Sequence, residues 1–395
     1  MSMNIRNTIK KTLKEAVGVV PHIHETSEKI YRILASSLSN DKWTPEKWKN
    51  EEEKEFHFSG DFKMGEYSFS EVFILVKAEE SDSNNPIEIN KMAVALEVEK
   101  LQDLTLRQGL ENDTLRLLIV LDINFDSDEI LSLSNYFGDY ISDYIQSEKP
   151  TIISSISHEI KHAYDAKKKE IVQPMDRASY LGPQNIGIGP VKPMQKFLFG
   201  LYFTHFIENS VRPNELHSLM VSNNITPKQF YDFLTNQRIF RMLKEYRDLT
   251  YEKFFNELKD DYMSEIEGFF IHIGFIGYKR MNDDEKVHRF LDFIAQGLKN
   301  STIQELEQIV FDSEGEAKLA QLGLVSKNKL AYMIKNAGII NRRFPDDGEK
   351  MFRSEIKDLN QISEKMIKKI SKLYSLINNK ATELTKVEKY KRHKK

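Results

Sequence analysis

The amino-acid sequence predicts an α+β fold in which a mostly antiparallel or mixed β-sheet is followed by a largely α-helical C-terminal region. Residues 56–125 are rich in β-branched and aromatic residues, a composition that is typical of strands. After residue 125 the apolar residues recur every three or four positions, which is typical of helices. With 395 residues, 40% of them hydrophobic, the chain can bury a sizeable core and form about two or three domains.

Four strands are predicted in the first of these two regions. The first begins at Phe56, and the second covers residues 67–76, where aromatic and β-branched residues dominate. In residues 87–98 the apolar side chains are mostly two apart, so this strand should bury one face. Residues 115–125 (LRLLIVLDINF) are the most apolar segment of the region, which favours a strand that is covered on both sides.

Two helices are predicted directly after the strands. The first has its N-cap region at residues 126–128 (DSD), because these side chains accept hydrogen bonds from the free backbone N–H groups of a first turn. The second has Pro150 in its first turn, where a backbone N–H is not needed. Its buried stripe is expected to consist of Ile152, Ile153, Ile156, Ile160 and Ala163.

A long loop and a long helix are expected in the rest of the chain. Residues 171–193 are rich in Pro and Gly without periodicity, which predicts a loop that lines a cleft. Helices then dominate from about Met194. The last, residues 352–390, has apolar residues at steps of three or four that form a coiled-coil-like seam, which we expect to pack on the protein's own helices. The basic segment 386–395 is expected to be a solvated helix end.

These patterns divide the chain into four segments. Residues 1–53 form an N-terminal helical segment that begins with an amphipathic helix, and residues 54–223 form the α+β domain. Residues 224–350 form a helical region, and residues 351–395 form the long C-terminal helix with its basic tail. We expect the sheet of the α+β domain to pack on the helix that contains residues 158–162.

The composition does not favour a thiolate metal site, nucleic-acid binding or a membrane span. The chain has no cysteine, so a metal site must use His, Asp or Glu. The formal net charge is -3, and aromatic residues are not interleaved with a basic face, so nucleic-acid binding is not expected. The longest apolar run, residues 269–277, is far shorter than the roughly 20 residues of a membrane span. We expect a soluble, cytoplasmic protein without a membrane partner.

The segment His158-Glu159-Ile160-Lys161-His162 has the pattern H-E-x-x-H in the second predicted helix. Two histidines four apart lie on one face of a helix, so both imidazoles can bind one metal ion. Glu159 can then reach a water on that ion and act as general base, which is the chemistry of zinc peptidases. The alternative is an accidental surface match to a short motif.

A catalytic zinc ion needs a third protein ligand. The best source in the sequence is residues 201–220, where Glu208 lies in a predicted helix that begins near Met194. Glu215, His205 and His217 are the alternatives in the same segment.

At this point the chain resembles the gluzincin branch of the zincin metallopeptidases, and more narrowly the small H-E-x-x-H proteins of tailed bacteriophages. The matching pieces are HEIKHAYD at residues 158–165 and YFTHFIENSVRPNEL at residues 202–216. The resemblance implies a zincin-like fold, Zn²⁺ bound by His158, His162 and Glu208, Glu159 as catalytic base, and the host cytoplasm or the virion as location. The sequence departs from thermolysin-like enzymes, since the ligand spacing is longer and their NExxSD pattern is missing.

Other polar residues are candidates for secondary roles. Asp165, three residues after His162, could accept the second N–H of that imidazole, or it could be a solvated carboxylate. Arg212 is interpreted first as an ion-pair partner that holds Glu208. Side chains that could donate to an oxyanion are Tyr164, Tyr180, His205 and Arg212.

Two further histidine positions are interpreted as structural. His22, His24 and Glu25 form a weak H-x-H-E pattern and are interpreted as ordinary loop residues. His272 lies beside aromatic residues and is interpreted as a core histidine.

The sequence therefore predicts a zinc-dependent metallopeptidase that acts on a protein or peptide. The alternative is a structural or assembly protein, plausibly phage-encoded, that retains a zincin-like module with little or no activity. A helix-mediated protein partner or self-association stays open under both hypotheses. The presence of Glu159 favours the enzyme, because a purely structural zinc site needs no general base.

Overall fold

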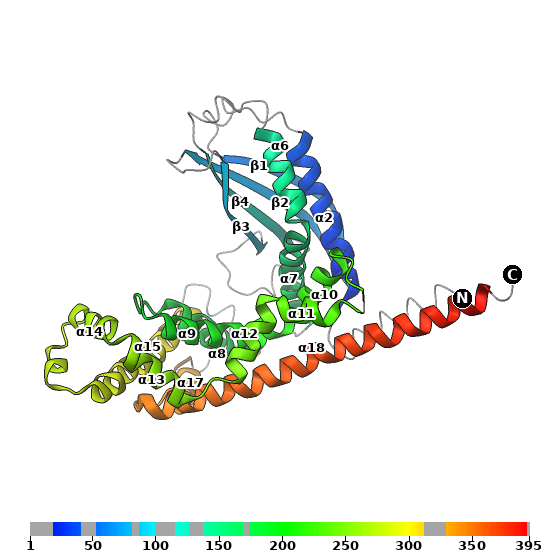
Figure 1. The fold of residues 1–395 in the computed structure, drawn as a ribbon. Helices are drawn as coiled ribbons and strands as arrows, with labels where there is room; N and C mark the ends of the chain where they lie inside the picture. Colours follow the sequence, from blue (N-terminus) through cyan, green and yellow to red (C-terminus); the bar gives the residue numbers. More distant parts are fainter. Residues whose placement is uncertain are drawn as a thin grey trace. The chain divides into compact units, whose positions relative to one another are not determined.

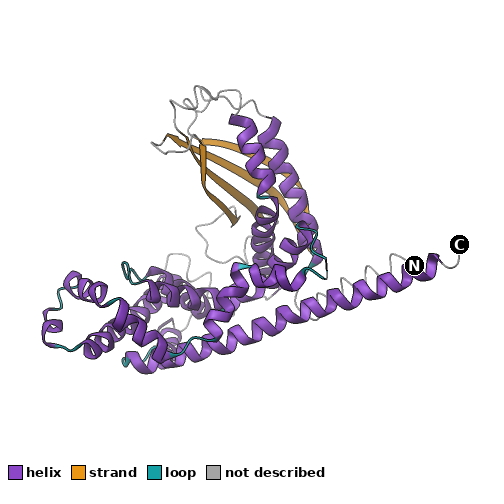
Figure 2. Ribbon diagram, viewed as in Figure 1, coloured by secondary structure: helices purple, strands orange, loops and turns teal. Residues whose placement is uncertain are grey.

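The structure is a computed structural model that describes residues 19–40, 53–80, 87–98, 115–125, 137–168, 174–226, 228–311 and 329–392 (Figures 1 and 2). The chain divides into two compact units. Unit 1 takes its described residues from 1–170, 210–233 and 370–395, and unit 2 takes them from 171–209 and 234–369. Each unit therefore draws on segments that are far apart in the sequence.

Unit 1 contains a four-stranded sheet in the order β1-β2-β4-β3. Its strands are β1 (Glu53–Met64), β2 (Tyr67–Glu80), β3 (Ile87–Val98) and β4 (Leu115–Phe125). β2 and β4 run parallel, whereas β1 pairs with β2 and β3 with β4 in antiparallel directions. The predicted strands and the predicted mixed sheet are confirmed.

Three helices pack on this sheet: α2 (Pro21–Asn40), α6 (Phe137–Ser147) and α7 (Lys149–Lys168) (Figure 1). The strands contribute buried residues two apart, such as Val72 and Ile74, because alternate side chains of a strand point to the same face. The predicted stripe of α7 is confirmed, and all five of its residues are buried in the same core. This packing fixes which face of α7 is left for polar residues.

The turn between β1 and β2 holds the C-terminal half of α7. Gly65 has φ +78° and lies so close to Tyr164 that an added Cβ would be 2.8 Å from the ring. The Tyr164 hydroxyl donates to the Glu66 carboxylate, with oxygen separations of 3.1 and 3.2 Å. Only glycine combines this backbone angle with this close approach at low cost.

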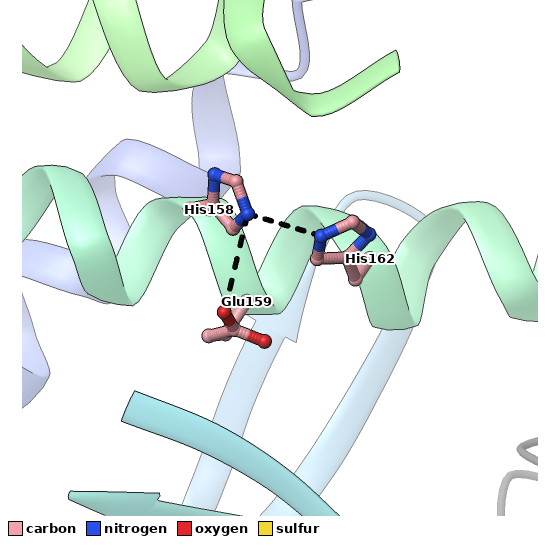
Figure 3. A group of neighbouring side chains, drawn as sticks. All are labelled: His158, Glu159 and His162. Atoms are coloured by element: carbon pink, nitrogen blue, oxygen red, sulfur yellow. Dashed lines mark hydrogen bonds and ion pairs between the residues drawn. The ribbon is translucent and has the colours of Figure 1, made fainter. Parts of the chain in front are cut away.

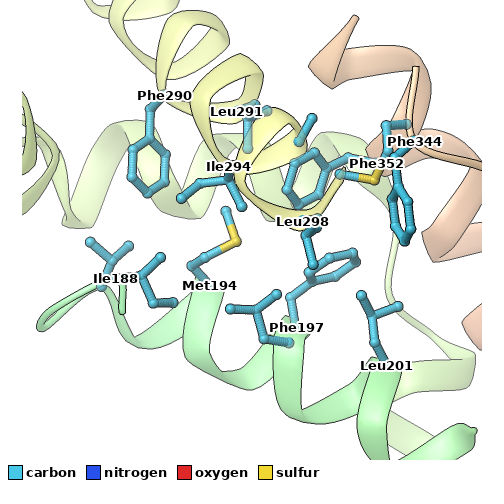
Figure 4. Packing of buried hydrophobic residues seen from close by; sticks show 14 of the residues in the cluster. Ile188, Met194, Phe197, Leu201, Phe290, Leu291, Ile294, Leu298, Phe344 and Phe352 are labelled. Carbon is cyan, nitrogen blue, oxygen red and sulfur yellow. The ribbon is translucent and has the colours of Figure 1, made fainter. Parts of the chain in front are cut away.

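Unit 2 is helical, and its core is formed mainly by α9 (Lys192–Thr204), α15 (Asp283–Phe311) and α18 (Gly348–Arg392) (Figure 4). Phe197 on α9 packs against Phe352 on α18, with ring centroids 4.8 Å apart. Its other described elements are α8 (Pro174–Leu181), η1 (Gly182–Asn185), α12 (Arg238–Arg247), α13 (Tyr251–Asp261), α14 (Met263–His272), η2 (Ile276–Arg280) and α17 (Lys329–Arg343). Three of the described helices have residues in both units: α10 (Phe206–Ser222), α11 (Phe230–Asn236) and α18.

The predicted loop at residues 171–193 is wrong for most of its length. Residues 174–185 form α8 and η1, and within the described residues only 186–191 are irregular. Pro174 begins one helix and Gly182 begins the next, so the prolines and glycines here mark helix ends. Gly182 is also required by packing, because its added Cβ would be 2.6 Å from the Thr302 hydroxyl on α15.

The helix that carries Glu208 also differs from the prediction. The sequence predicted that it begins near Met194, whereas α9 ends at Thr204 and α10 begins at Phe206. His205 between them has ψ 145°, which is an extended backbone angle that interrupts a helix. Glu208 therefore lies in the first turn of α10.

The long C-terminal helix is confirmed, with Ile356 and Leu359 in the core of unit 2. For these two residues the seam packs on the protein's own helices, as predicted. The helix predicted at the start of the chain, the N-cap at residues 126–128 and the side chains of the basic tail fall outside the described residues. Among the described helices, none is long and apolar enough to cross a membrane.

Replacement of Gly65 by alanine is expected to lower the free energy of unfolding by about 2–4 kcal/mol, because it combines a left-handed backbone angle with a clash against Tyr164. Gly189→Ala is the matched control, since Gly189 has φ +57° with no atom within 4 Å of an added Cβ. We expect it to cost about 1 kcal/mol. Urea unfolding of both variants measures the difference, and equal losses would contradict the packing described here.

Candidate metal centre

His158, Glu159 and His162 lie together on α7 (Figure 3). One ligand atom from each residue lies within 4.8 Å of the others. The Nε2 atoms of the two histidines face each other at 3.0 Å, and His158 Nε2 lies 4.0 Å from Glu159 Oε1. The sequence prediction that this motif is helical and brings the three side chains together is confirmed.

The distance between the two imidazole nitrogens suits a shared cation. Two nitrogens bound to one zinc ion at about 2.0–2.1 Å with tetrahedral angles are about 3.3 Å apart. The observed separation is 3.0 Å. At this distance either one nitrogen carries a proton that it donates to the other, or a cation lies between two lone pairs. The residues therefore fit a metal ion without a change of backbone.

Glu215 on α10 is hydrogen-bonded to the other nitrogen of His158. Its Oε2 atom lies 3.1 Å from His158 Nδ1 and also accepts from Arg212 Nη1 at 2.8 Å. The acceptor at Nδ1 favours the tautomer in which Nδ1 carries the proton, which leaves Nε2 for a metal ion. Glu215, an alternative third ligand in the sequence analysis, thus contacts the side of the ring that faces away from the cluster.

The charges of this pair stabilise each other. Burial disfavours a charged His158, but the hydrogen bond and the charge of Glu215 outweigh it and raise the pKa of His158 above its ordinary value. Burial also disfavours the Glu215 carboxylate, but His158 and Arg212 together lower the pKa of Glu215 below its ordinary value. The carboxylate is therefore ionised at neutral pH, as its role as acceptor requires.

A buried hydrogen-bond network sets the position of α10 on α7. Asn214 Nδ2 donates to Ser157 Oγ at 2.8 Å, and Ser218 Oγ donates to the same oxygen at 2.7 Å. Ser154 Oγ donates to the backbone oxygen of Glu215 at 3.2 Å. The network continues to Val20, whose backbone N–H donates to Asn214 Oδ1 at 2.8 Å. Glu215 is thus held in register with His158 by contacts on both sides of it.

Glu208 lies among residues of unit 2. Its side chain is buried, and Oε1 accepts hydrogen bonds from the hydroxyls of Tyr180 at 3.0 Å and Tyr202 at 3.1 Å. Burial, together with the Glu208 carboxylate, raises the pKa of Tyr180 well above its ordinary value, so this tyrosine stays a donor. The assignment of Glu208 as third ligand stays a prediction.

Of the two histidines considered as alternative ligands, His217 is buried and His205 is half-buried. His205 packs against the Tyr180 ring, with centroids 5.3 Å apart, and burial lowers its pKa to about 4. His217 on α10 meets His24 on α2 edge to face, with centroids 6.0 Å apart. Both His24 and His217 are 8% exposed, and the Nδ1 atom of each has no hydrogen-bond partner within the described residues. They form a buried neutral pair.

The side chains predicted for secondary roles have other contacts. Asp165 accepts from Lys161 through Oδ1, and its Oδ2 has no partner among the described residues. Its side chain is 15% exposed, so neither alternative, a contact with His162 or a solvated carboxylate, is observed. Lys161 precedes Asp165 by four residues, so its ammonium group lies on the same helix face and pairs with this carboxylate. Arg212 forms an ion pair with Glu215, and Tyr164 donates to Glu66. Neither contact tests a role in oxyanion binding.

Two of the structural interpretations of histidine are wrong in detail. His22 and His24 lie in the first turns of α2 instead of in a loop, and His22 Nδ1 lies 3.1 Å from Glu25 Oε2. His272 is exposed, because α14 buries Ile266 and Phe270 and ends at His272. The interpretation of His272 as a core histidine, which was based on its aromatic neighbours in the sequence, is therefore wrong.

The pairing of Glu215 with His158, and of Asn214 with Ser157 beside it, was not predicted from the sequence. A signal was present, because Ser154, Ser157 and Lys161 form a second stripe on α7 that is not apolar. All three are buried, so the stripe indicates a polar contact with another element.

Comparison with known proteins does not assign a family. No protein-family model, no curated protein and no solved structure matches this chain. A functional assignment therefore depends on the chemistry of the residues described above.

The buried histidine pair should make metal-free protein less stable in weak acid. Burial is the main cause that lowers the pKa of His217 to about 4, whereas the unfolded value is about 6.5, so the unfolded chain binds more protons between these values. The free energy of unfolding should therefore rise with pH across this window and fall by about 3 kcal/mol on acidification to pH 4. Urea unfolding between pH 4.5 and about 7 measures this dependence.

His217→Gln is expected to reduce this dependence on pH. His22→Gln is the control, since His22 lies on the same helix as His24 with a side chain that is 48% exposed. The charges of Glu25, Glu28 and Lys149 also affect the pKa of His24, and all three residues are unchanged in both variants. An identical slope in wild type and His217→Gln would contradict the buried neutral state.

Proposed function

We propose that this protein is a zinc-dependent metallopeptidase in which His158 and His162 bind the metal ion and Glu159 is the general base. The observation that carries the proposal is the pair of Nε2 atoms 3.0 Å apart with a carboxylate beside them on one helix. Two imidazoles and a carboxylate are the donors that zinc uses when no thiolate is present. The substrate class is a protein or peptide.

Zinc and Glu159 have separate roles in the proposed hydrolysis. Zinc, when bound, acts as a Lewis acid toward a carbonyl oxygen and makes a coordinated water more acidic. Glu159 would be the group that accepts a proton from the attacking water and returns it to the leaving amine. Its side chain is 26% exposed, so its carboxylate is reachable from solvent and is not locked in the core.

Glu215 and Arg212 support the metal ligand His158 in this proposal. A carboxylate that accepts the second ring N–H of a metal-bound histidine fixes the orientation of the ring and makes it a stronger ligand. Arg212 neutralises part of the charge of Glu215, with an Nη1–Oε2 distance of 2.8 Å. The side chains of Arg212 and Glu215 are 11% and 17% exposed, which limits the competition of water for these hydrogen bonds.

Glu208 is the third ligand that we propose on chemical grounds. A buried carboxylate needs donors, and the hydroxyls of Tyr180 and Tyr202 donate to its Oε1 atom. A zincin-like module in unit 1 is part of the same proposal, supported by the mixed sheet that packs on the helix of the motif.

The direct test is the variant Glu159→Gln. We expect it to keep bound zinc and to lose peptidase activity by a factor of about 10²–10⁴, because only the general base is removed. His162→Ala is expected to lose both zinc and activity. Metal content by mass spectrometry, and cleavage of casein and of a mixed peptide library, measure the two properties separately.

Two other outcomes have clear meanings. Zinc bound by the wild type without cleavage of any peptide would favour the structural or assembly protein over the enzyme. A wild type that binds no zinc after incubation with the metal would exclude both hypotheses, since each includes the metal site.

The third ligand is tested by Glu208→Ala. Loss of a residue bound directly to the metal should weaken zinc affinity substantially, by about a factor of 10³ or more, and should abolish cleavage. Glu215→Gln is the comparison, and it should weaken affinity by about 10–100-fold because it acts only through His158. Zinc affinity is measured by competition with a chelator. Full affinity in Glu208→Ala would refute this ligand while leaving the two histidines in place.

A further inference from the structure

The end of α14 and the following η2 expose an apolar surface that the proposed peptidase does not use. Ile271 is 66% exposed, Ile273 41% and Ile276 76%. These three isoleucines fall within seven residues, together with exposed Gly274 and Gly277. We name residues 271–280 the tip segment; α14 stands at one end of unit 2 in Figure 1. Three exposed branched aliphatic side chains so close together mark an interaction surface.

The aromatic residues of the same segment point inward and hold it in place. Phe270 and Tyr278 are buried, with ring centroids 5.6 Å apart. Phe275 contacts both Phe270 at 5.4 Å and Phe293 of α15 at 5.4 Å. The isoleucines are therefore presented by an anchored turn, and little conformational entropy is lost when they are buried by a partner.

Three backbone N–H groups of the tip segment are paired within the turn that follows α14. The N–H groups of Ile273, Gly274 and Phe275 donate to the carbonyls of Phe269, Ile271 and Phe270, at 3.0, 3.1 and 2.8 Å. Gly274 makes this possible with φ +71°. Backbone groups that are already paired can enter an apolar medium without the cost of unpaired N–H groups.

Positive charge lies directly beside the isoleucines. Lys279 and Arg280 are exposed, and no ion pair is recorded for either within the part of the chain that the structure describes. Acidic residues lie on both sides of the segment, and three of them form ion pairs with lysines. Lys286 pairs with Glu267 at 2.7 Å and with Asp283 at 3.2 Å. Lys259 pairs with Asp284 at 2.8 Å. The tip segment thus combines exposed aliphatic side chains with free cations.

We propose that the tip segment binds an anionic lipid surface by inserting its isoleucines at the level of the headgroups. Apolar side chains next to lysine and arginine are the composition of segments that lie in a membrane interface. The exposed Lys279 and Arg280 beside the isoleucines favour an anionic lipid surface over an uncharged one. The expectation that the protein has no membrane partner came from the absence of a spanning segment, and surface binding requires none.

The test is co-sedimentation of the full chain with vesicles of phosphatidylcholine, with and without phosphatidylserine. Wild type should bind the vesicles that contain phosphatidylserine, and Ile271→Ser/Ile276→Ser should bind at least about tenfold more weakly. Lys279→Glu/Arg280→Glu should lose the preference for phosphatidylserine. All four side chains are exposed, so the folded state should be kept, and circular dichroism checks this.

Ile334→Ser is the matched control, because Ile334 is an equally exposed isoleucine (64%) on α17. It should bind vesicles like wild type. Absence of binding by wild type, undiminished binding by the double serine variant, or an equal loss in Ile334→Ser would each overturn the proposal. Zinc content and peptidase activity in solution should not change in the tip variants, so this test is independent of the metal site.

Discussion

Polar contacts between α7 and α10 inside unit 1 decide what the H-E-x-x-H motif can do. A serine, an asparagine, a histidine and a glutamate are removed from water where the two helices meet, and each has a partner there. Buried polar groups are costly when they are unpaired and specific when they are paired, because only one relative position of the helices satisfies them all. Apolar side chains at the same positions would allow α10 to slide or rotate on α7.

This arrangement has a direct effect on the chemistry of the motif. Without a metal ion, a protonated His158 can donate from Nδ1 to Glu215 and from Nε2 to His162, which fits the raised pKa of its ring. A metal ion at Nε2 has to replace that second proton, while the bond to Glu215 is kept. Metal binding should therefore release protons and grow stronger with rising pH, as is general for histidine sites.

Much of the fold could be predicted from local patterns. Strands β1 to β4 and helix α7 follow from alternation and from apolar steps of three or four. β1, β2, β4 and α7 contribute buried side chains to a common core. Prediction was wrong at residues 174–185, where Pro174 and Gly182 begin helices instead of forming a loop. It was also wrong at His205, which separates α9 from α10, whereas the apolar pattern predicted a single helix. In both places packing in unit 2 decides the structure, and packing is not visible in a local window.

The two adjacent pairs on α7 and α10 have the same separation in the sequence, since Ser157 to Asn214 and His158 to Glu215 both span 57 residues. Two neighbouring residues on one helix therefore match two neighbouring residues on the other. The informative signature of such a site is then S-H-E-x-x-H together with a distant N-E, which is rarer by chance than H-E-x-x-H alone. During divergence Ser157 and Asn214 should change together, so covariation of this pair would distinguish true relatives from accidental matches to the short motif.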